Sequence, residues 1–167
     1  MAGKRNWFYS FNQKIATSRP GVMVYKRTLH LFDALVSKLT GDRHTMTSLF
    51  AGAPTAWVTT TGAKSGMQRT TPLIIVHDPQ DAKRFALIGT NFGRKRYPGW
   101  YYNLKTTPRA TCKIKNQTAD YKAHMASGEE YEKFWQAAGD VYLGYPKYKN
   151  RIGSQREIPI IVLTPEG

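Results

Sequence analysis

Residues 56–77 read AWVTTTGAKSGMQRTTPLIIVH, and this stretch is the most informative in the chain. A strand-like run up to Thr61 enters a short turn rich in glycine, and a second strand-like run begins at Leu73. The glycines let backbone amides approach a bound group, while Lys64 and Arg69 bring positive charge to the same turn. We therefore expect a β-hairpin whose turn binds the anionic part of a cofactor. The alternative is an ordinary hairpin with a solvated lysine.

The composition is that of one folded domain with an additional segment. The 167 residues are 41% hydrophobic, which argues against disorder. A single cysteine, Cys112, excludes an internal disulfide framework. No apolar run approaches the roughly 18 residues of a membrane-spanning helix, and the N-terminus does not resemble a signal peptide. We therefore expect a cytoplasmic protein.

The chain is strongly basic, with 25 Lys and Arg against 11 Asp and Glu and a net charge of +14. Such an excess favours anionic ligands, nucleic acid or an anionic membrane surface as partners. The cations are dispersed along the chain, so a generally basic, soluble surface is the alternative interpretation.

Residues 1–46 differ from the remainder and are expected to form an amphipathic helical segment ahead of a domain over residues 47–167. From Tyr25 to Leu39 the apolar residues recur at steps of three and four, with basic side chains between them. Such a helix could lie peripherally on the anionic inner face of the cell membrane. The alternative is that its apolar face packs on the domain.

After Pro54 the pattern changes to short β-like runs separated by turn signals. This predicts a mostly β (α+β) fold, a small antiparallel barrel with peripheral helices. The expected strands cover residues 56–61, 70–77, 84–89, 110–115, 118–125 and 158–163, and the expected helices cover 98–105 and 129–138.

Several catalytic patterns are missing from the sequence. The four histidines lack metal-ligand spacing and one cysteine cannot build a zinc site, so we expect no metal. The turn at Gly62 lacks the GxxxxGK[ST] pattern of a phosphate loop, and Ser65 is not in a GxSxG motif. If the chain is an enzyme, a cofactor therefore supplies the reactive chemistry.

The hairpin turn is followed by Gly89-Thr90-Asn91, by Trp100-x-x-Asn103-Leu104-x-x-x-Pro108 and by Arg156-Glu157-Ile158-Pro159. With this combination, residues 50–165 resemble the deazaflavin-dependent nitroreductases, the split-barrel quinone reductases that use coenzyme F-420, an 8-hydroxy-5-deazaflavin. The resemblance implies a split β-barrel like that of FMN-binding proteins. It also implies hydride transfer from reduced coenzyme F-420 to a quinone such as menaquinone, with nitroaromatics or activated enones as side substrates.

The resemblance further implies which residues bind the coenzyme, with Lys64 and Arg69 holding its anionic tail. Ala63 stands where arginine is usual, and Asn91-Phe92-Gly93-Arg94 replaces a turn of small residues, so the substrate stays open. The expected coenzyme-binding residues are Thr60, Ala63, Lys64, Ser65, Gly66, Met67, Gln68, Arg69, Pro72, Gly89, Thr90, Asn91, Gly99, Trp100, Asn103 and Tyr145.

Tyr142, Tyr145 and Tyr148 are the expected catalytic residues, because they recur every three residues and would form one ridge on a helix. We expect a rim over the deazaflavin face, where Tyr145 donates a proton. Core packing is the alternative for this row. For Trp100 the alternative is a barrel plug without ligand contact, and for Asn103 a hydrogen bond within its own helix.

Three other functions stay open at this point. The chain could be an FMN-binding split-barrel oxidoreductase of the pyridoxamine-phosphate-oxidase type, or a deazaflavin carrier without catalysis. It could also be a non-enzymatic nucleic-acid-binding protein, which the dispersed cations disfavour. The sequence leaves the oligomeric state and the physiological electron acceptor undetermined.

Overall fold

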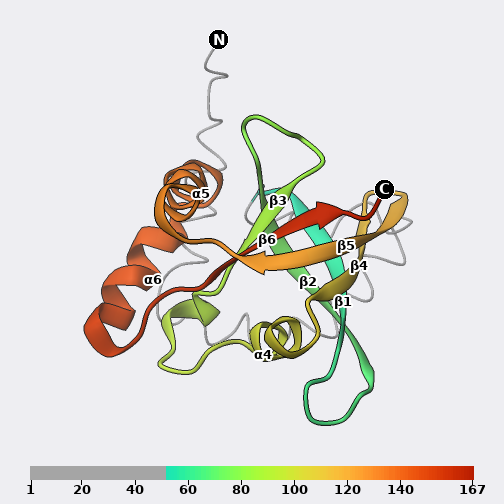
Figure 1. Ribbon diagram of the computed structural model, residues 1–167. Coiled ribbons are helices and arrows are strands. Elements are labelled where there is room, and N and C mark those ends of the chain that lie inside the picture. Colours follow the sequence, from blue (N-terminus) through green and yellow to red (C-terminus); the bar gives the residue numbers. More distant parts are fainter. Residues whose placement is uncertain (1–51) are drawn as a thin grey trace.

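The structure is a computed structural model that describes residues 52–167. Six antiparallel strands close into a barrel in the order β1-β2-β3-β6-β5-β4 (Figure 1). The expected antiparallel barrel is thus confirmed. The strands are β1 (Thr55–Thr61), β2 (Gln68–His77), β3 (Phe85–Ile88), β4 (Arg109–Ile114), β5 (Gln117–Met125) and β6 (Ile160–Pro165).

The helices lie outside the barrel, as the sequence predicts. They are η1 (Asn91–Gly93), α4 (Gly99–Thr106), α5 (Gly128–Val141), α6 (Gly144–Ile152) and η2 (Gly153–Gln155). Helix α4 packs on β1, α5 packs on β2 and β6, and α6 covers η1. Figure 1 shows α5 and α6 together on one side of the barrel and α4 beside the β1–β2 hairpin.

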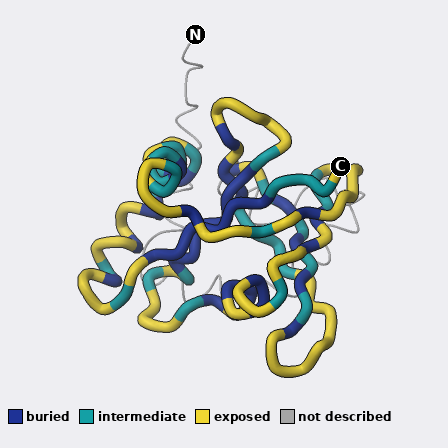
Figure 2. Tube along the Cα trace, viewed as in Figure 1, coloured by how far each residue is buried: buried dark blue, intermediate teal, exposed yellow. Residues whose placement is uncertain are grey.

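The core consists of two clusters on either side of the sheet, because alternate side chains of a strand point to opposite faces. In β6, Ile161 and Leu163 belong to one cluster, which also contains Trp100 and Leu104 of α4. The neighbouring Ile160 and Val162 belong to the other cluster, beneath α5 and α6. All four are buried, so β6 is covered on both faces (Figure 2).

The predicted strand boundaries agree closely with the structure except at the last strand. The sequence predicts residues 158–163, whereas β6 begins at Ile160. Pro159 has no N–H to donate to a neighbouring strand, which delays the start of regular pairing. Its carbonyl still accepts a hydrogen bond of 2.8 Å from the amide of Gly89.

Residues 1–51 lie outside the described part of the chain. The amphipathic segment over residues 1–46, the division at residue 47 and the membrane contact therefore stay predictions. Within residues 52–167, no helix is long and apolar enough to cross a membrane.

Candidate functional site

The turn between β1 and β2 is closed by its own backbone. The Gly62 amide donates to the Met67 carbonyl at 2.8 Å, and the Gly66 amide donates to the Gly62 carbonyl at 2.8 Å. Gly66 has a φ of +67°, in the left-handed region that favours glycine. A Cβ atom at Gly62 would lie 2.6 Å from the Ser65 Oγ atom and 3.1 Å from the Met67 carbonyl oxygen, so a larger residue would have to displace the Ser65 side chain.

Two amides of this turn remain available to a ligand. The Ala63 amide donates to Asn103 Oδ1 at 3.0 Å, and the Met67 amide donates to Ser65 Oγ at 3.4 Å. The Lys64 and Ser65 amides have no hydrogen-bond partner among residues 52–167.

Both cationic side chains of the hairpin are exposed, and no carboxylate of the described residues pairs with Lys64 or Arg69. Figure 2 shows the tip of the hairpin as an exposed loop. The turn thus combines two unpaired amides with two unpaired positive charges, which is the donor set of an anion site.

Asn103 fixes the hairpin to helix α4. Besides accepting from the Ala63 amide, its Nδ2 atom donates to Thr60 Oγ1 at 2.9 Å, and both side chains are buried. The alternative of a hydrogen bond within its own helix is therefore wrong, because both partners of the side chain belong to the hairpin. Both ends of the Asn103 amide thus bond to the hairpin and hold the turn in place.

The turn after β3 forms a second group of expected site residues. Gly89 is packed against Pro159, whose Cγ atom would lie 2.5 Å from a Cβ at this position. Thr90 is buried, whereas Asn91 and Phe92 have φ values of 47° and 57°, which residues other than glycine rarely adopt. The Asn91 side chain donates to the Arg96 carbonyl at 2.8 Å.

The three tyrosines are buried and do not form the expected open rim. Tyr142 follows the end of α5, and only Tyr145 and Tyr148 lie on α6, so the row is not one helical ridge. The hydroxyls of Tyr142 and Tyr148 share a hydrogen bond of 3.1 Å within the core. The alternative of core packing therefore describes this row. The row lies against the turn after β3, because the Phe92 ring contacts the Tyr148 ring edge-on.

The remaining expected residues have varied surroundings. Trp100 is buried in the barrel cluster. Met67 is 65% exposed at the hairpin tip, and the Gln68 side chain donates to Thr61 Oγ1 at 3.2 Å. Pro72 pairs with Trp57 across the β1–β2 ladder, and Gly99 begins α4 in open space.

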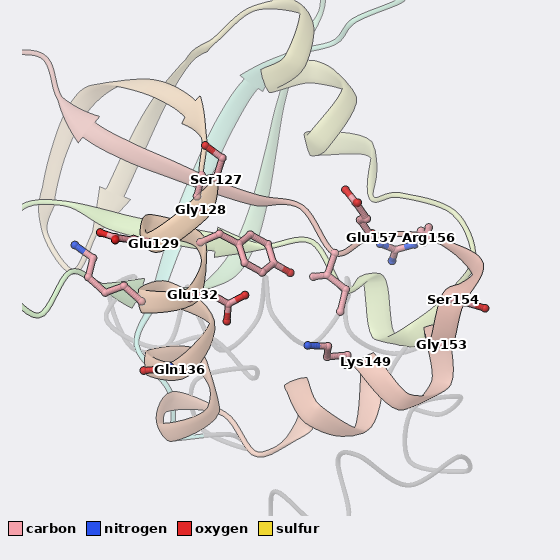
Figure 3. Close-up of a pocket in the computed structure, with 14 residues that line it drawn as sticks. Ser127, Gly128, Glu129, Glu132, Gln136, Lys149, Gly153, Ser154, Arg156 and Glu157 are labelled. Carbon is pink, nitrogen blue, oxygen red and sulfur yellow. Dashed lines mark hydrogen bonds between the residues drawn. The ribbon is translucent and has the colours of Figure 1, made fainter.

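A large cavity of about 1250 Å³ lies elsewhere, between α5, α6 and the segment that precedes β6. Figure 3 shows Glu132 of α5 and Lys149 of α6 pointing into it. Glu129 and Glu157 also line this cavity, and none of the residues expected to bind the coenzyme does. Its three carboxylates are balanced by Lys133, Lys149 and Arg156, which also line it, whereas both charged side chains of the hairpin turn are cationic, so the hairpin suits an anion better.

No group of histidine, cysteine, aspartate and glutamate side chains within residues 52–167 could hold a metal ion.

Comparisons with known proteins give the family of this chain. The profile of the family described as F-420H(2)-dependent quinone reductase matches residues 31–165. An F-420H(2)-dependent quinone reductase of Mycobacterium tuberculosis is 31% identical over 114 residues, which cover 66% of this chain and 73% of that protein.

Solved structures show the same fold. A structure described as an F-420-H2-dependent reductase (FDR-A) has a TM-score of 0.59 and 32% identity, covering 66% of this chain and 93% of its own. Another, described only as a domain-swapped dimer, has a TM-score of 0.61 and 28% identity, covering 86% of this chain and 98% of its own.

Proposed function

This chain belongs to the F-420H(2)-dependent quinone reductase family, and on that premise we propose that it reduces a lipid-soluble quinone such as menaquinone. It is accordingly an oxidoreductase, and its cofactor is coenzyme F-420. Nitroaromatics and activated enones are proposed as side substrates, because a pocket for flat acceptors selects weakly by shape.

The observation that carries this proposal is the donor set of the hairpin turn. Coenzyme F-420 has a phosphodiester and a carboxylate-rich tail, both anionic. The unpaired amides of Lys64 and Ser65 suit oxygen acceptors, and the side chains of Lys64 and Arg69 supply opposite charge. The residues present therefore fit the coenzyme.

When bound, the reduced deazaflavin supplies a hydride, and the quinone becomes a hydroquinone by also gaining a proton. The chain supplies positioning and electrostatic stabilisation, since no nucleophile is needed. Burial raises the pKa of the Tyr145 hydroxyl, so this group stays protonated at neutral pH. Although Tyr145 is buried, we propose that this tyrosine or a water delivers the proton to the developing oxyanion.

Binding and turnover measured on the full chain test the proposal. Separate titrations with coenzyme F-420, FMN and FAD should show tight binding of coenzyme F-420 alone. With reduced coenzyme F-420 the protein should then reduce menadione, a soluble quinone. Tight FMN binding would favour the FMN-dependent alternative, and coenzyme binding without turnover would favour a carrier.

We also propose that the protein meets its quinone at the inner face of the cell membrane, as a cytoplasmic protein held there by residues 1–40. The support is the basic amphipathic pattern of that sequence. Deletion of residues 1–20 should reduce co-sedimentation with anionic liposomes and leave the reduction of menadione intact. Unaltered co-sedimentation would refute the membrane contact.

A further inference from the structure

Arg156 directs its guanidinium at three backbone carbonyls. Its Nη2 atom donates to the Thr90 carbonyl at 2.9 Å, and its Nε atom donates to the Arg94 carbonyl at 3.1 Å. Its Nη1 atom donates to the carbonyl of its neighbour Glu157 at 2.8 Å. The first two bonds join the two ends of the turn formed by Thr90–Arg94.

The same guanidinium also connects this turn to helix α4. Its central carbon lies 4.8 Å from the ring centroid of Tyr97, within the range of a cation–π contact. Tyr97 in turn stacks on Tyr101 of α4, with ring centroids 4.6 Å apart and planes inclined by 30°. Tyr101 is buried in the barrel cluster, so the arginine is supported by a rigid element.

The turn requires such a support because of its backbone. Asn91 and Phe92 both adopt left-handed conformations, which persist in residues other than glycine only where the surroundings enforce them. Phe92 is only partly covered, since the residue is 39% exposed. Two backbone bonds within the turn, from the Gly93 amide to the Thr90 carbonyl and from the Arg94 amide to the Asn91 carbonyl, hold it locally. The Arg156 bonds at Thr90 and Arg94 add a constraint that fixes the turn at both ends.

We propose that Arg156 is a positioning residue, which holds the Thr90–Arg94 turn in its binding conformation before coenzyme F-420 arrives. This inference rests on the proposed function, since the family resemblance assigns Thr90 and Asn91 to the coenzyme site. The inference goes further, because Arg156 is not among the expected coenzyme-binding residues and is given control of the conformation of this turn. A lysine cannot replace it, because an ammonium group lacks the planar fork that reaches separate carbonyls.

Hydrogen exchange and coenzyme titration of four full-length variants test this role. R156K keeps the charge, R156Q removes it, and Y97L removes the aromatic support but keeps the arginine. R109K is the matched control, because Arg109 is 68% exposed and pairs with Glu166. Circular dichroism first shows which variants are folded. If R156Q is not folded, R156K and Y97L provide the test.

In the coenzyme-free protein, we expect amide exchange over residues 90–97 to be at least tenfold faster in R156K and R156Q. Exchange in the hairpin over residues 62–67 should match that of the wild type. The Kd for coenzyme F-420 should rise at least tenfold in both, less in Y97L, and remain unchanged in R109K.

Unchanged exchange over residues 90–97 in folded R156K and R156Q would overturn the inference. So would faster exchange with an unchanged Kd, because the turn would then have no part in coenzyme binding. If the wild type itself failed to bind coenzyme F-420, the proposed function would fall. The exchange measurement would still decide whether Arg156 holds the turn.

Discussion

Lys64 and Ser65 occupy the part of the hairpin turn where the backbone does not bond to itself. Gly62, Ala63, Gly66 and Met67 use their amides to close the turn or to anchor it to α4. The sequence predicts an anion site here from its glycines and cations, but it does not reveal this division among the amides. Most of the glycine-rich backbone is structural, and two amides remain for a ligand.

The charged side chains of the turn should therefore dominate coenzyme affinity. Replacement of both Lys64 and Arg69 by alanine should cost about 1.5–3 kcal/mol per charged hydrogen bond, which is about 10- to 150-fold in Kd for each. Titration of coenzyme fluorescence measures this loss. K122A, an exposed lysine on β5, is the control and should bind normally. Near-normal binding by the double variant would remove the hairpin from the site.

Tyr145 tests the source of the proton. Burial raises the pKa of its hydroxyl, so the group is protonated throughout the neutral range and can act only as a donor there. If it protonates the substrate, Y145F should lower kcat for menadione by about 10²-fold and leave the coenzyme Kd unchanged. The control is Y131F, in the cavity beside α5. An unchanged kcat in Y145F would assign the proton to water.

At the scale of elements, helix α4 and the β1–β2 hairpin act as one unit because Asn103 joins them. The motif containing Asn103 is visible in the sequence, but its bonding partners are not, because Thr60 and Ala63 lie about forty residues away in the chain. Local periodicity predicts elements well, and it carries no information on side-chain contacts between distant elements.

Removal of the Asn103 side chain should loosen the hairpin. In N103A the Thr60 hydroxyl and the Ala63 amide lose their partner, which should lower the free energy of unfolding by about 1–3 kcal/mol. Urea denaturation measures this change, with N150A, an exposed asparagine on α6, as the control. A stability equal to that of the wild type would show that Asn103 does not anchor the hairpin.

The tyrosine row shows why part of the site could not be predicted. A spacing of three residues indicates a ridge only if all three lie on one helix, and α5 ends before Tyr142 while α6 begins at Gly144. The break turns the phenols into the space between the helices and the barrel, where two hydroxyls bond to each other. Mutual hydrogen bonding satisfies these two hydroxyls in the core, which the three-residue spacing does not reveal.

At the scale of the whole molecule, a buried ionic network fastens α5 to the barrel. Asp78, whose side chain is 1% exposed, pairs with Arg84 at 3.1 Å and with Lys133 of α5 at 3.0 Å. Arg84 also pairs with Glu130 of α5 at 2.8 Å. Burial alone would raise the pKa of Asp78, but hydrogen bonds from Gln80 and Lys133 and the charges of Lys133 and Arg84 together lower it.

This network predicts a loss of stability in acid. Because the pKa of Asp78 is lower in the folded state, its contribution is complete above the unfolded value of about 4 and is lost as the pH falls below it. D78N should lower the free energy of unfolding at pH 7 by about 1.5–3 kcal/mol and reduce its dependence on pH below 4. Denaturant titrations at pH 7 and pH 3 test both effects.

The exposed neighbour Asp81 provides the control for this experiment. D81N should be as stable at pH 7 as the wild type and should lose stability in acid in the same way. Equal acid sensitivity of D78N and the wild type would mean that Asp78 does not govern the acid response.

The binding of coenzyme F-420 at the hairpin is measured most directly by nuclear magnetic resonance of the ¹⁵N-labelled full chain. On titration with coenzyme F-420, the amide signals of Lys64 and Ser65 should move more than those of Gly62 and Gly66, whose amides are already bonded within the turn. If the coenzyme bound while the Lys64 and Ser65 signals stayed in place, the anion site would lie elsewhere on the protein.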